Sequence, residues 1–312
     1  MSRPPLRLGT RKSPMAMAQS AAVASLITER TGAAVELVGL TSFGDVSQAQ
    51  LTQIGGTGVF VSALRECLLA GDIDLAVHSL KDLPTAGVPG IALAAVPVRD
   101  DPRDALVARD GAKLADLPAG ALIGTGSPRR AAQLRLMRPD VRPVPVRGNA
   151  GTRLAKVTSG ELDAVVLARA GLDRIGQLDV ITEVFEPDEM IPAAGQGALA
   201  VECRDSDRGL AGLLARVDDP DSHAAATAER AVLAGLQAGC HAPVGAHAIA
   251  TGMLHLRAVV IGNDGPPLAA GAAAPAGEAE RLGREVAREL LRRGAGRYLT
   301  AAAVHTSNGD DA

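Results

Sequence analysis

Four polar side chains follow one another where an apolar segment ends, in "GDIDLAVHSLKDLP" (residues 71–84): His78, Ser79, Lys81 and Asp82. The continuous apolar run predicts a strand buried on both faces. A carboxylate at its end, among cations, would stay ionised and could stabilise a cationic intermediate or relay a proton. The other interpretation of Asp82 is a surface salt bridge or a turn cap. A Ser-His-Asp triad is disfavoured, because neighbours on a strand face opposite ways and the chain has no G-x-S-x-G elbow.

Basic residues are concentrated between Thr125 and Lys156. This stretch has eight basic residues and the single acid Asp140, a local charge of +7, whereas the whole chain carries −3. Forked guanidinium groups bind carboxylates and phosphates through paired hydrogen bonds. We therefore expect an anion site here. The basic residues are Arg129, Arg130, Arg135, Arg138, Arg142, Arg147, Arg153 and Lys156.

Two Ser-Pro turns, at Ser13 and Ser127, predict helix starts with serine as the N-cap. Arg11 precedes the first turn and Arg129 follows the second, and a helix N-terminus beside an arginine suits an anion. The alternative is a solvated helix start with incidental arginines. Carboxylates are favoured over phosphates, because the chain has no G-x-x-x-x-G-K-[ST] loop and "GQGALA" (195–200) precedes a predicted strand instead of a helix.

The three cysteines, Cys67, Cys203 and Cys240, are odd in number and widely spaced, which argues against a disulfide framework or a C-x-x-C site. Cys240 lies in "GCHAPVGAHA", after a predicted helix, and has two interpretations. It is either a small buried hydrophobic residue or an exposed thiol that could carry a covalent group. Its spacing from His241 and His247 matches no familiar metal site, so no metal is predicted.

The elements that must position these residues occur twice. Residues 7–19 and 122–133 both predict a strand, a Gly-Thr turn and a Ser-Pro helix start, and residues 70–79 and 159–168 both predict a turn and a buried strand. Two similar α/β domains follow from this order. From Asp218 a third unit opens. There Asp221 or Ser222 is expected to cap an alanine-rich helix that ends at Gly239.

Composition limits the partners. The chain has 312 residues, room for two or three domains, and a near-neutral charge. Aromatic residues make up 1% and tryptophan is absent, which argues against base-stacking nucleic-acid binders. No apolar run reaches about 20 residues, the length of a membrane span, and the first residues do not form an apolar leader. We expect a cytoplasmic protein without nucleic-acid or membrane partners.

The motifs taken together resemble the porphobilinogen deaminase (hydroxymethylbilane synthase) family over nearly the whole chain. Each motif alone is weak, but their shared order is specific. The motifs are "RLGTRKSPMA", "GGTGVF", "DLAVHSLKDLP", "DPRDALV", "IGTGSPRR", "VRGNAGTR", "LARAGLDR", "GQGALAVECR" and "GCHAPVGAHA".

The resemblance implies two periplasmic-binding-protein-like (type II) α/β domains around a cleft and a small C-terminal α+β domain. The expected bounds are residues 1–98 with 197–216 for the first domain, 103–191 for the second and 220–312 for the third. It also implies a monomer that takes the small-molecule substrate porphobilinogen.

The resemblance further implies a covalent dipyrromethane cofactor, joined by a thioether to Cys240. Four porphobilinogens would be added in turn with loss of ammonia, and hydrolysis would release hydroxymethylbilane for tetrapyrrole biosynthesis. Asp82 would be catalytic. Carried over by motif, the other cofactor-binding residues would be Ser79, Lys81, Thr125, Ser127, Arg129, Arg130 and Arg147. The substrate-binding residues would be Arg11, Ser13, Gln19, Arg147, Arg153 and Arg174.

A rival interpretation is a non-catalytic solute-binding or ligand-sensing protein for carboxylates. It would explain the duplication and the anion sites. It would require neither Asp82 nor a third domain with Cys240, so those two residues separate the hypotheses.

Overall fold

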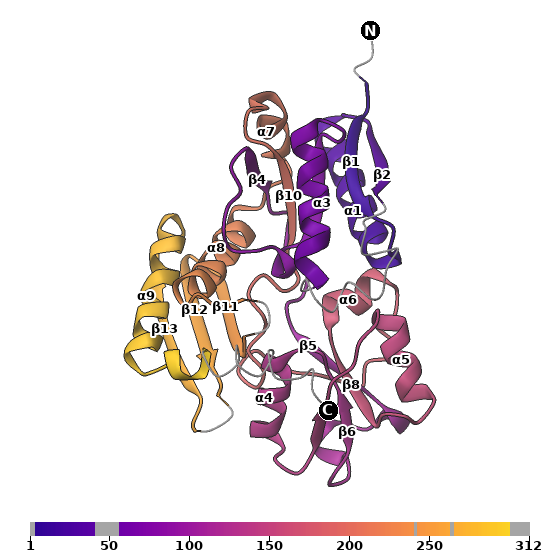
Figure 1. Cartoon of the computed structure of the whole chain (residues 1–312), viewed down its shortest axis with the longest axis vertical. Helices are drawn as coiled ribbons and strands as arrows, with labels where there is room; N and C mark the ends of the chain where they lie inside the picture. Colours follow the sequence, from indigo (N-terminus) through magenta and orange to yellow (C-terminus); the bar gives the residue numbers. More distant parts are fainter. Residues whose placement is uncertain (1–3, 41–55, 240–241, 263–264, 300–312) are drawn as a thin grey trace, which may run out of the picture. The chain divides into compact units, whose positions relative to one another are not determined.

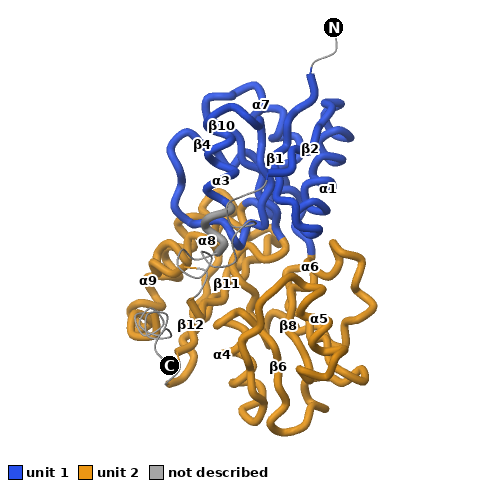
Figure 2. Tube along the Cα trace, turned by 45° about the vertical axis from the view of Figure 1, so that its right-hand side comes forward, with its two compact units in different colours: residues 1–100, 198–223 blue, residues 101–197, 224–312 orange. Residues whose placement is uncertain are grey.

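A computed structural model describes residues 4–40, 56–239, 242–262 and 265–299. Its elements are labelled in Figure 1. The chain divides into two compact units, residues 1–100 with 198–223 and residues 101–197 with 224–312 (Figure 2). The three-domain bounds given above remain a prediction. No helix in the described ranges is both long and apolar enough to cross a membrane.

The first unit is built on a mixed sheet. Its first three strands are parallel, and β10 runs antiparallel to both of its neighbours. Among the described residues the strand order is β2 (Val35–Leu40), β1 (Leu6–Arg11), β3 (Leu75–Ser79), β10 (Leu199–Arg204) and β4 (Ile91–Ala95). The covering helices are α1 (Pro14–Thr31), α3 (Gly56–Ala70) and α7 (Arg208–Leu214).

The two faces of this sheet can be told apart by their packing. Leu75 and Val77 of β3 belong to a core with residues of α1 and α7, whereas Ala76 packs with Leu64 and Leu68 of α3. Strand residues alternate between faces, so His78, two residues after Ala76, faces α3.

The second unit repeats this arrangement. Its three parallel strands are joined by an antiparallel fourth strand, β5, as β10 joins those of the first unit. In the described part of the chain the strand order is β7 (Arg142–Val144), β6 (Leu122–Gly124), β8 (Ala164–Ala168), β5 (Asp104–Ala108) and β9 (Glu183–Val184). The helices are α4 (Pro128–Met137), α5 (Ala150–Thr158) and α6 (Arg169–Arg174).

The matching strand orders confirm the predicted duplication and the two periplasmic-binding-protein-like α/β folds. The Ser-Pro helix starts are confirmed as well. The Ser13 hydroxyl accepts the N–H of Ala16 at the start of α1, and the Ser127 hydroxyl accepts the N–H of Arg130 at the start of α4. In both helices proline stands at the first position, where its missing N–H costs nothing.

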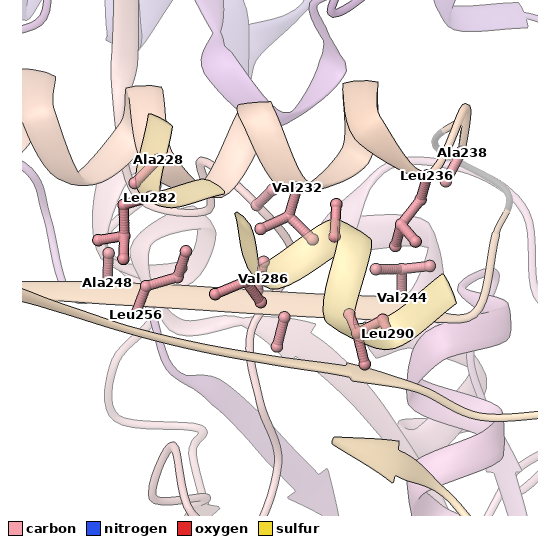
Figure 3. Packing of buried hydrophobic residues seen from close by; sticks show 14 of the residues in the cluster. Ala228, Val232, Leu236, Ala238, Val244, Ala248, Leu256, Leu282, Val286 and Leu290 are labelled. Atoms are coloured by element: carbon pink, nitrogen blue, oxygen red, sulfur yellow. The ribbon is translucent and has the colours of Figure 1, made fainter. Parts of the chain in front are cut away.

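The C-terminal part forms an antiparallel meander of β11 (Val244–Thr251), β12 (Met253–Val260) and β13 (Leu268–Ala274). Helices α8 (Pro220–Gly235) and α9 (Ala279–Arg292) share one apolar core with these strands (Figure 3). This confirms the small α+β domain. The buried Glu229 of α8 joins this helix to β11 and to the loop before β10, because its two carboxylate oxygens accept the N–H groups of Gly195 and Ala248.

The predicted ends of α8 are wrong. Asp219, not Asp221 or Ser222, caps the helix by accepting the N–H of Ser222 at 2.8 Å, and Pro220 takes the first helical position. The helix ends at Gly235 instead of Gly239, because Gln237 adopts a left-handed backbone with φ 51°. The Ala238 N–H then bonds to the carbonyl of Leu233, which closes the helix early.

Helices α8 and α9 approach closely at Gly283. A Cβ added there would lie 2.2 Å from the Ala228 carbonyl oxygen and 2.5 Å from the Ala231 Cβ. We therefore expect Gly283→Ala to lower the free energy of unfolding by about 1–3 kcal/mol, because the helices must separate. Urea denaturation would measure this. Gly212→Ala on α7 is the control: nothing lies within 4 Å of a Cβ there. Equal stability of both variants would contradict the packing argument.

Candidate active site

Asp82 lies on a single turn of 3₁₀ helix, η1 (Leu80–Asp82), that begins where β3 ends. The turn is fixed from two sides: the Leu80 N–H donates to the Ala198 carbonyl at 3.0 Å, and the Leu83 N–H donates to the Leu80 carbonyl at 3.2 Å. The buried strand predicted from the sequence is confirmed. Asp82 itself is half-buried, so a backbone tied to the sheet presents a carboxylate that solvent or a ligand can reach.

Other predicted residues of the first unit gather at the same edge. Strands β1 and β3 are parallel neighbours, so their carboxyl ends, with Arg11 and Ser79, lie at one end of the sheet. The buried Gln19 of α1 reaches this edge, where its Nε2 donates to the Ser79 hydroxyl at 2.9 Å. Ser13 caps α1 and Lys81 is half-buried on the η1 turn. The structure therefore brings the predicted residues of this unit together.

In the second unit the turn from Thr125 to Ser127 lies at the equivalent edge of the sheet, and the guanidinium group of Arg153 lies beside it. The Thr125 hydroxyl accepts the Ser127 N–H at 3.2 Å. A Cβ at Gly126, between them, would lie 3.0 Å from the Val146 carbonyl oxygen and 3.8 Å from an amino nitrogen of Arg153. A side chain at residue 126 would therefore crowd the Val146 carbonyl, so the close approach of these two backbone segments favours glycine.

Arg153 carries the charge of this turn. Its Nε donates to the Gly148 carbonyl at 2.9 Å, and no carboxylate pairs with it anywhere in the described ranges. Burial, reinforced by the nearby Arg130, lowers the pKa of Arg153. A partly buried cation beside a second cation is stabilised by an anion, so this turn suits a carboxylate ligand.

Arg129 and Arg130 are buried around Asp104, the first residue of β5. An amino nitrogen of each arginine lies 2.7 Å from a different Asp104 oxygen. Burial by itself would raise the pKa of Asp104, but the two arginines lower it to about 2. Two guanidinium groups face one carboxylate, so the cluster keeps one net positive charge. Binding of cofactor carboxylates by this pair remains a prediction.

Asp104 and Gln196 are residues that the sequence reasoning missed. Gln196 Nε2 donates to Asp104 at 2.8 Å and to the Pro102 carbonyl at 2.7 Å, so it holds the start of β5 beside the arginines. The only signals were indirect. Asp104 lies in "DPRDALV" and Gln196 in "GQGALAVECR", two motifs of the family resemblance to which no site residue was assigned.

The remaining predicted basic residues differ in their surroundings. Arg147 is exposed, and the half-buried Arg174 donates to the Gly197 carbonyl at 2.7 Å. Arg138 pairs with Asp140 and donates to backbone carbonyls, and Lys156 pairs with Glu161. The local charge of +7 is therefore partly matched inside the fold. Cys240 and His241 lie outside the described residues, so their interpretations remain open.

The Asp104 cluster predicts a pH dependence of stability. In the folded protein the pKa of Asp104 is about 2, below its ordinary value of 3.8. The stabilisation that the ionised Asp104 gives is therefore complete above pH 4 and is lost as the pH falls through about 2. We expect Asp104→Asn to cost about 3–5 kcal/mol at neutral pH, because it leaves two buried cations uncompensated. The difference from the original chain should shrink by about 2 kcal/mol between pH 4 and 2.

Urea denaturation at several pH values measures both effects. Asp140→Asn is the matched control, because Asp140 also pairs with an arginine but lies at the surface. It should change stability little. A loss for Asp104→Asn no greater than that of the control would show that the buried cluster is not important for folding.

Comparison with known proteins gives two matching family models. The model described as "Porphobilinogen deaminase, dipyromethane cofactor binding domain" matches residues 6–211. The model described as "Porphobilinogen deaminase, C-terminal domain" matches residues 223–292.

Curated relatives are similar over almost their entire length. Porphobilinogen deaminase from Thermobifida fusca (strain YX) is 58% identical, over 97% of this chain and 98% of its own. Porphobilinogen deaminase 1 from Streptomyces coelicolor is 53% identical, over 95% of this chain and 97% of its own. The Mycobacterium tuberculosis (strain H37Ra) porphobilinogen deaminase is 50% identical, over 93% and 97%.

Solved structures of binding proteins are more distant. The methionine binding protein MetQ has a TM-score of 0.44 at 11% identity, over 68% of this chain and 89% of its own. An arginine-specific periplasmic binding protein from Salmonella typhimurium has a TM-score of 0.39 at 15% identity, over 71% and 94%.

Proposed function

The chain belongs to the porphobilinogen deaminase family, and we propose that it joins four porphobilinogen molecules in turn to a covalently bound dipyrromethane cofactor, then releases hydroxymethylbilane by hydrolysis. It is a transferase of tetrapyrrole biosynthesis. The observation that carries this proposal is the match of both family models, which together span residues 6–211 and 223–292.

The charges at the two sheet edges suit the substrate. Porphobilinogen carries an acetate and a propionate, and each addition brings two more carboxylates to the bound chain. Arg11 would bind such groups in the first unit, and Arg147, Arg153 and Arg174 would bind them in the second. Forked guanidinium groups can hold each carboxylate through two hydrogen bonds.

The turn from Thr125 to Ser127 fits the carboxylates of a dipyrromethane. Gly126 packs closely against the Val146 carbonyl, the Ser127 cap begins a helix, and Arg153, beside the turn, has no carboxylate partner within the described residues. When bound, the dipyrromethane supplies the pyrrole carbon to which the first substrate is joined. The residues that would hold its acid side chains are Thr125, Ser127, Arg129, Arg130 and Arg147, and Arg153 beside the turn would bind carboxylates of the substrate. Ser79 and Lys81 are the cofactor-binding residues proposed for the first unit, and Cys240 would provide the thioether sulfur.

Asp82 is proposed as the catalytic residue. Loss of ammonia leaves the substrate electron-poor, and its pyrrole nitrogen gains positive character. A carboxylate that accepts the pyrrole N–H stabilises that charge and can move a proton as it develops and disappears. The half-buried position of Asp82 on a fixed turn supports this role, because a held carboxylate needs no rearrangement when the charge forms.

The solute-binding alternative is not favoured, because the relatives that match nearly the whole chain are named as deaminases. A direct assay separates the two. The purified chain, given porphobilinogen, should release ammonia and hydroxymethylbilane, which cyclises and oxidises to a coloured porphyrin. Stoichiometric binding of porphobilinogen without release of ammonia would favour the alternative. The proposal includes a cytoplasmic monomer. Light scattering of the purified chain would measure its mass in solution and so test whether it is a monomer.

A further inference from the structure

A buried charged cluster in the first unit is not used by the proposed chemistry. It consists of Arg65 on α3, His78 on β3 and Glu202 on β10, each less than one-tenth exposed. Arg65 binds both oxygens of Glu202: Nε donates to Oε2 at 3.0 Å and an amino nitrogen donates to Oε1 at 2.6 Å. The same Oε2 lies 3.3 Å from Nε2 of His78.

The strand register explains why these side chains meet. In the antiparallel pair of β3 and β10, Ala200 lies opposite His78 and Glu202 lies opposite Ala76. Glu202 and His78 are therefore diagonal neighbours on one face of the sheet, the face that α3 covers. Arg65 belongs to that helix. The carboxylate of Glu202 on β10 therefore contacts side chains of both α3 and β3.

The carboxylate is ionised at every pH at which the protein would work. Burial by itself would raise the pKa of Glu202, but His78 and Arg65 lower it to about 2. Arg65 donates one hydrogen bond to each oxygen of the carboxylate, and this bidentate pairing fixes the orientation of the carboxylate group.

This cluster lies immediately before the η1 turn. His78 is followed by Ser79, whose hydroxyl accepts from Gln19, and then by the turn that carries Asp82. The carbonyl of Ala198, four residues before Glu202, accepts the Leu80 N–H. The segment around β10 therefore holds the end of β3 through the strand pairing, through this backbone bond and through the Glu202 side chain beside His78.

We propose that Glu202 is a positioning residue for Asp82: its carboxylate, bound by Arg65 and facing His78, fixes the end of β3 and hence the place of the catalytic carboxylate. This inference rests on the proposed function of Asp82. Small displacements of a reacting group reduce catalysis strongly, so such a role affects turnover more than substrate binding.

The rival explanation is that the cluster only stabilises the fold. Two variants distinguish these explanations: one removes a single charge of the cluster and the other removes both Arg65 and Glu202 charges. Glu202→Gln leaves Arg65 buried without its charge partner, so it should lower both stability and turnover. The double variant Arg65→Met/Glu202→Met removes both charges and should recover most of the stability. A purely structural role predicts that turnover recovers with it, whereas a positioning role predicts that turnover stays low.

A matched control comes from the other end of the same strand. Asp74, just before β3, pairs with Arg7 and Arg204 and so also links β1, β3 and β10. Asp74→Asn removes an ion pair of the same sheet without touching the cluster or the η1 turn. It should affect stability but leave kcat close to that of the original chain.

The experiment uses the full-length protein with its cofactor, and measures thermal unfolding, kcat and KM for porphobilinogen, and hydrogen exchange of residues 79–83. For Glu202→Gln and for the double variant we expect kcat to fall by about 10- to 100-fold, with a much smaller change in KM. The amides of Leu80 and Leu83 should exchange faster in both, but not in Asp74→Asn.

Full kcat in the double variant, with unchanged exchange of residues 79–83, would overturn the positioning role. Failure of the original chain to consume porphobilinogen would instead count against the proposed function. In that case the exchange comparison still decides whether Glu202 holds the turn, because it does not depend on activity.

Discussion

Asp82→Asn is expected to lower kcat for porphobilinogen by at least about 100-fold while KM changes only a few-fold. Asparagine has the shape of aspartate and can still accept a hydrogen bond from a pyrrole N–H. It lacks the negative charge that would stabilise the electron-poor substrate and it cannot take up a proton. Steady-state kinetics on protein with a confirmed cofactor content would measure the effect.

Asp72→Asn provides the control for that experiment. Asp72 belongs to the same "GDIDLAVHSLKDLP" stretch but is exposed, at the opposite end of the strand. It should keep the turnover of the original chain. Near-normal turnover in Asp82→Asn would remove Asp82 from the mechanism, and substrate binding lost in step with turnover would make it a binding residue instead.

Cys240→Ala is expected to abolish turnover and to yield protein whose intact mass is that of the bare polypeptide. The original chain should carry the additional mass of two linked pyrrole units. The other two thiols are poor candidates for such a bond. Burial raises the pKa of both Cys67 and Cys203, which disfavours the reactive thiolate, and Cys203 is completely enclosed in the core.

Cys67→Ala is the matched control, because it removes a half-buried thiol of similar chemistry. Its mass increase and its turnover should match those of the original chain. Retention of the added mass in Cys240→Ala would place the attachment elsewhere, and an active chain without added mass would refute the covalent cofactor.

Local patterns in the sequence predicted local structure well. The apolar run before His78 and the Ser-Pro pairs at Ser13 and Ser127 act over a few residues, through burial on both faces and through a single cap. Both features are found. The end of α8 was missed because Gln237 takes a left-handed conformation that usually requires glycine, so the glycine at position 239 gave a false signal.

Partners that are distant in the chain could not be predicted. Arg65 and Glu202 are 137 residues apart, and Asp104 meets Arg130 only because β5 joins the sheet antiparallel to β8. A count of charges along the sequence therefore overestimated the free positive charge. It counted Arg129 and Arg130 as two unpaired charges, whereas the fold buries both beside the carboxylate of Asp104.

A pyrrole chain that grows while it is attached to this protein should be visible as added mass on the protein itself. Intact-mass spectrometry would follow the full-length chain during the first turnovers with limiting porphobilinogen. We predict a series of species, one to four steps heavier than the resting protein, each step equal to porphobilinogen minus ammonia. Consumption of porphobilinogen with no heavier protein species at any time would contradict the account.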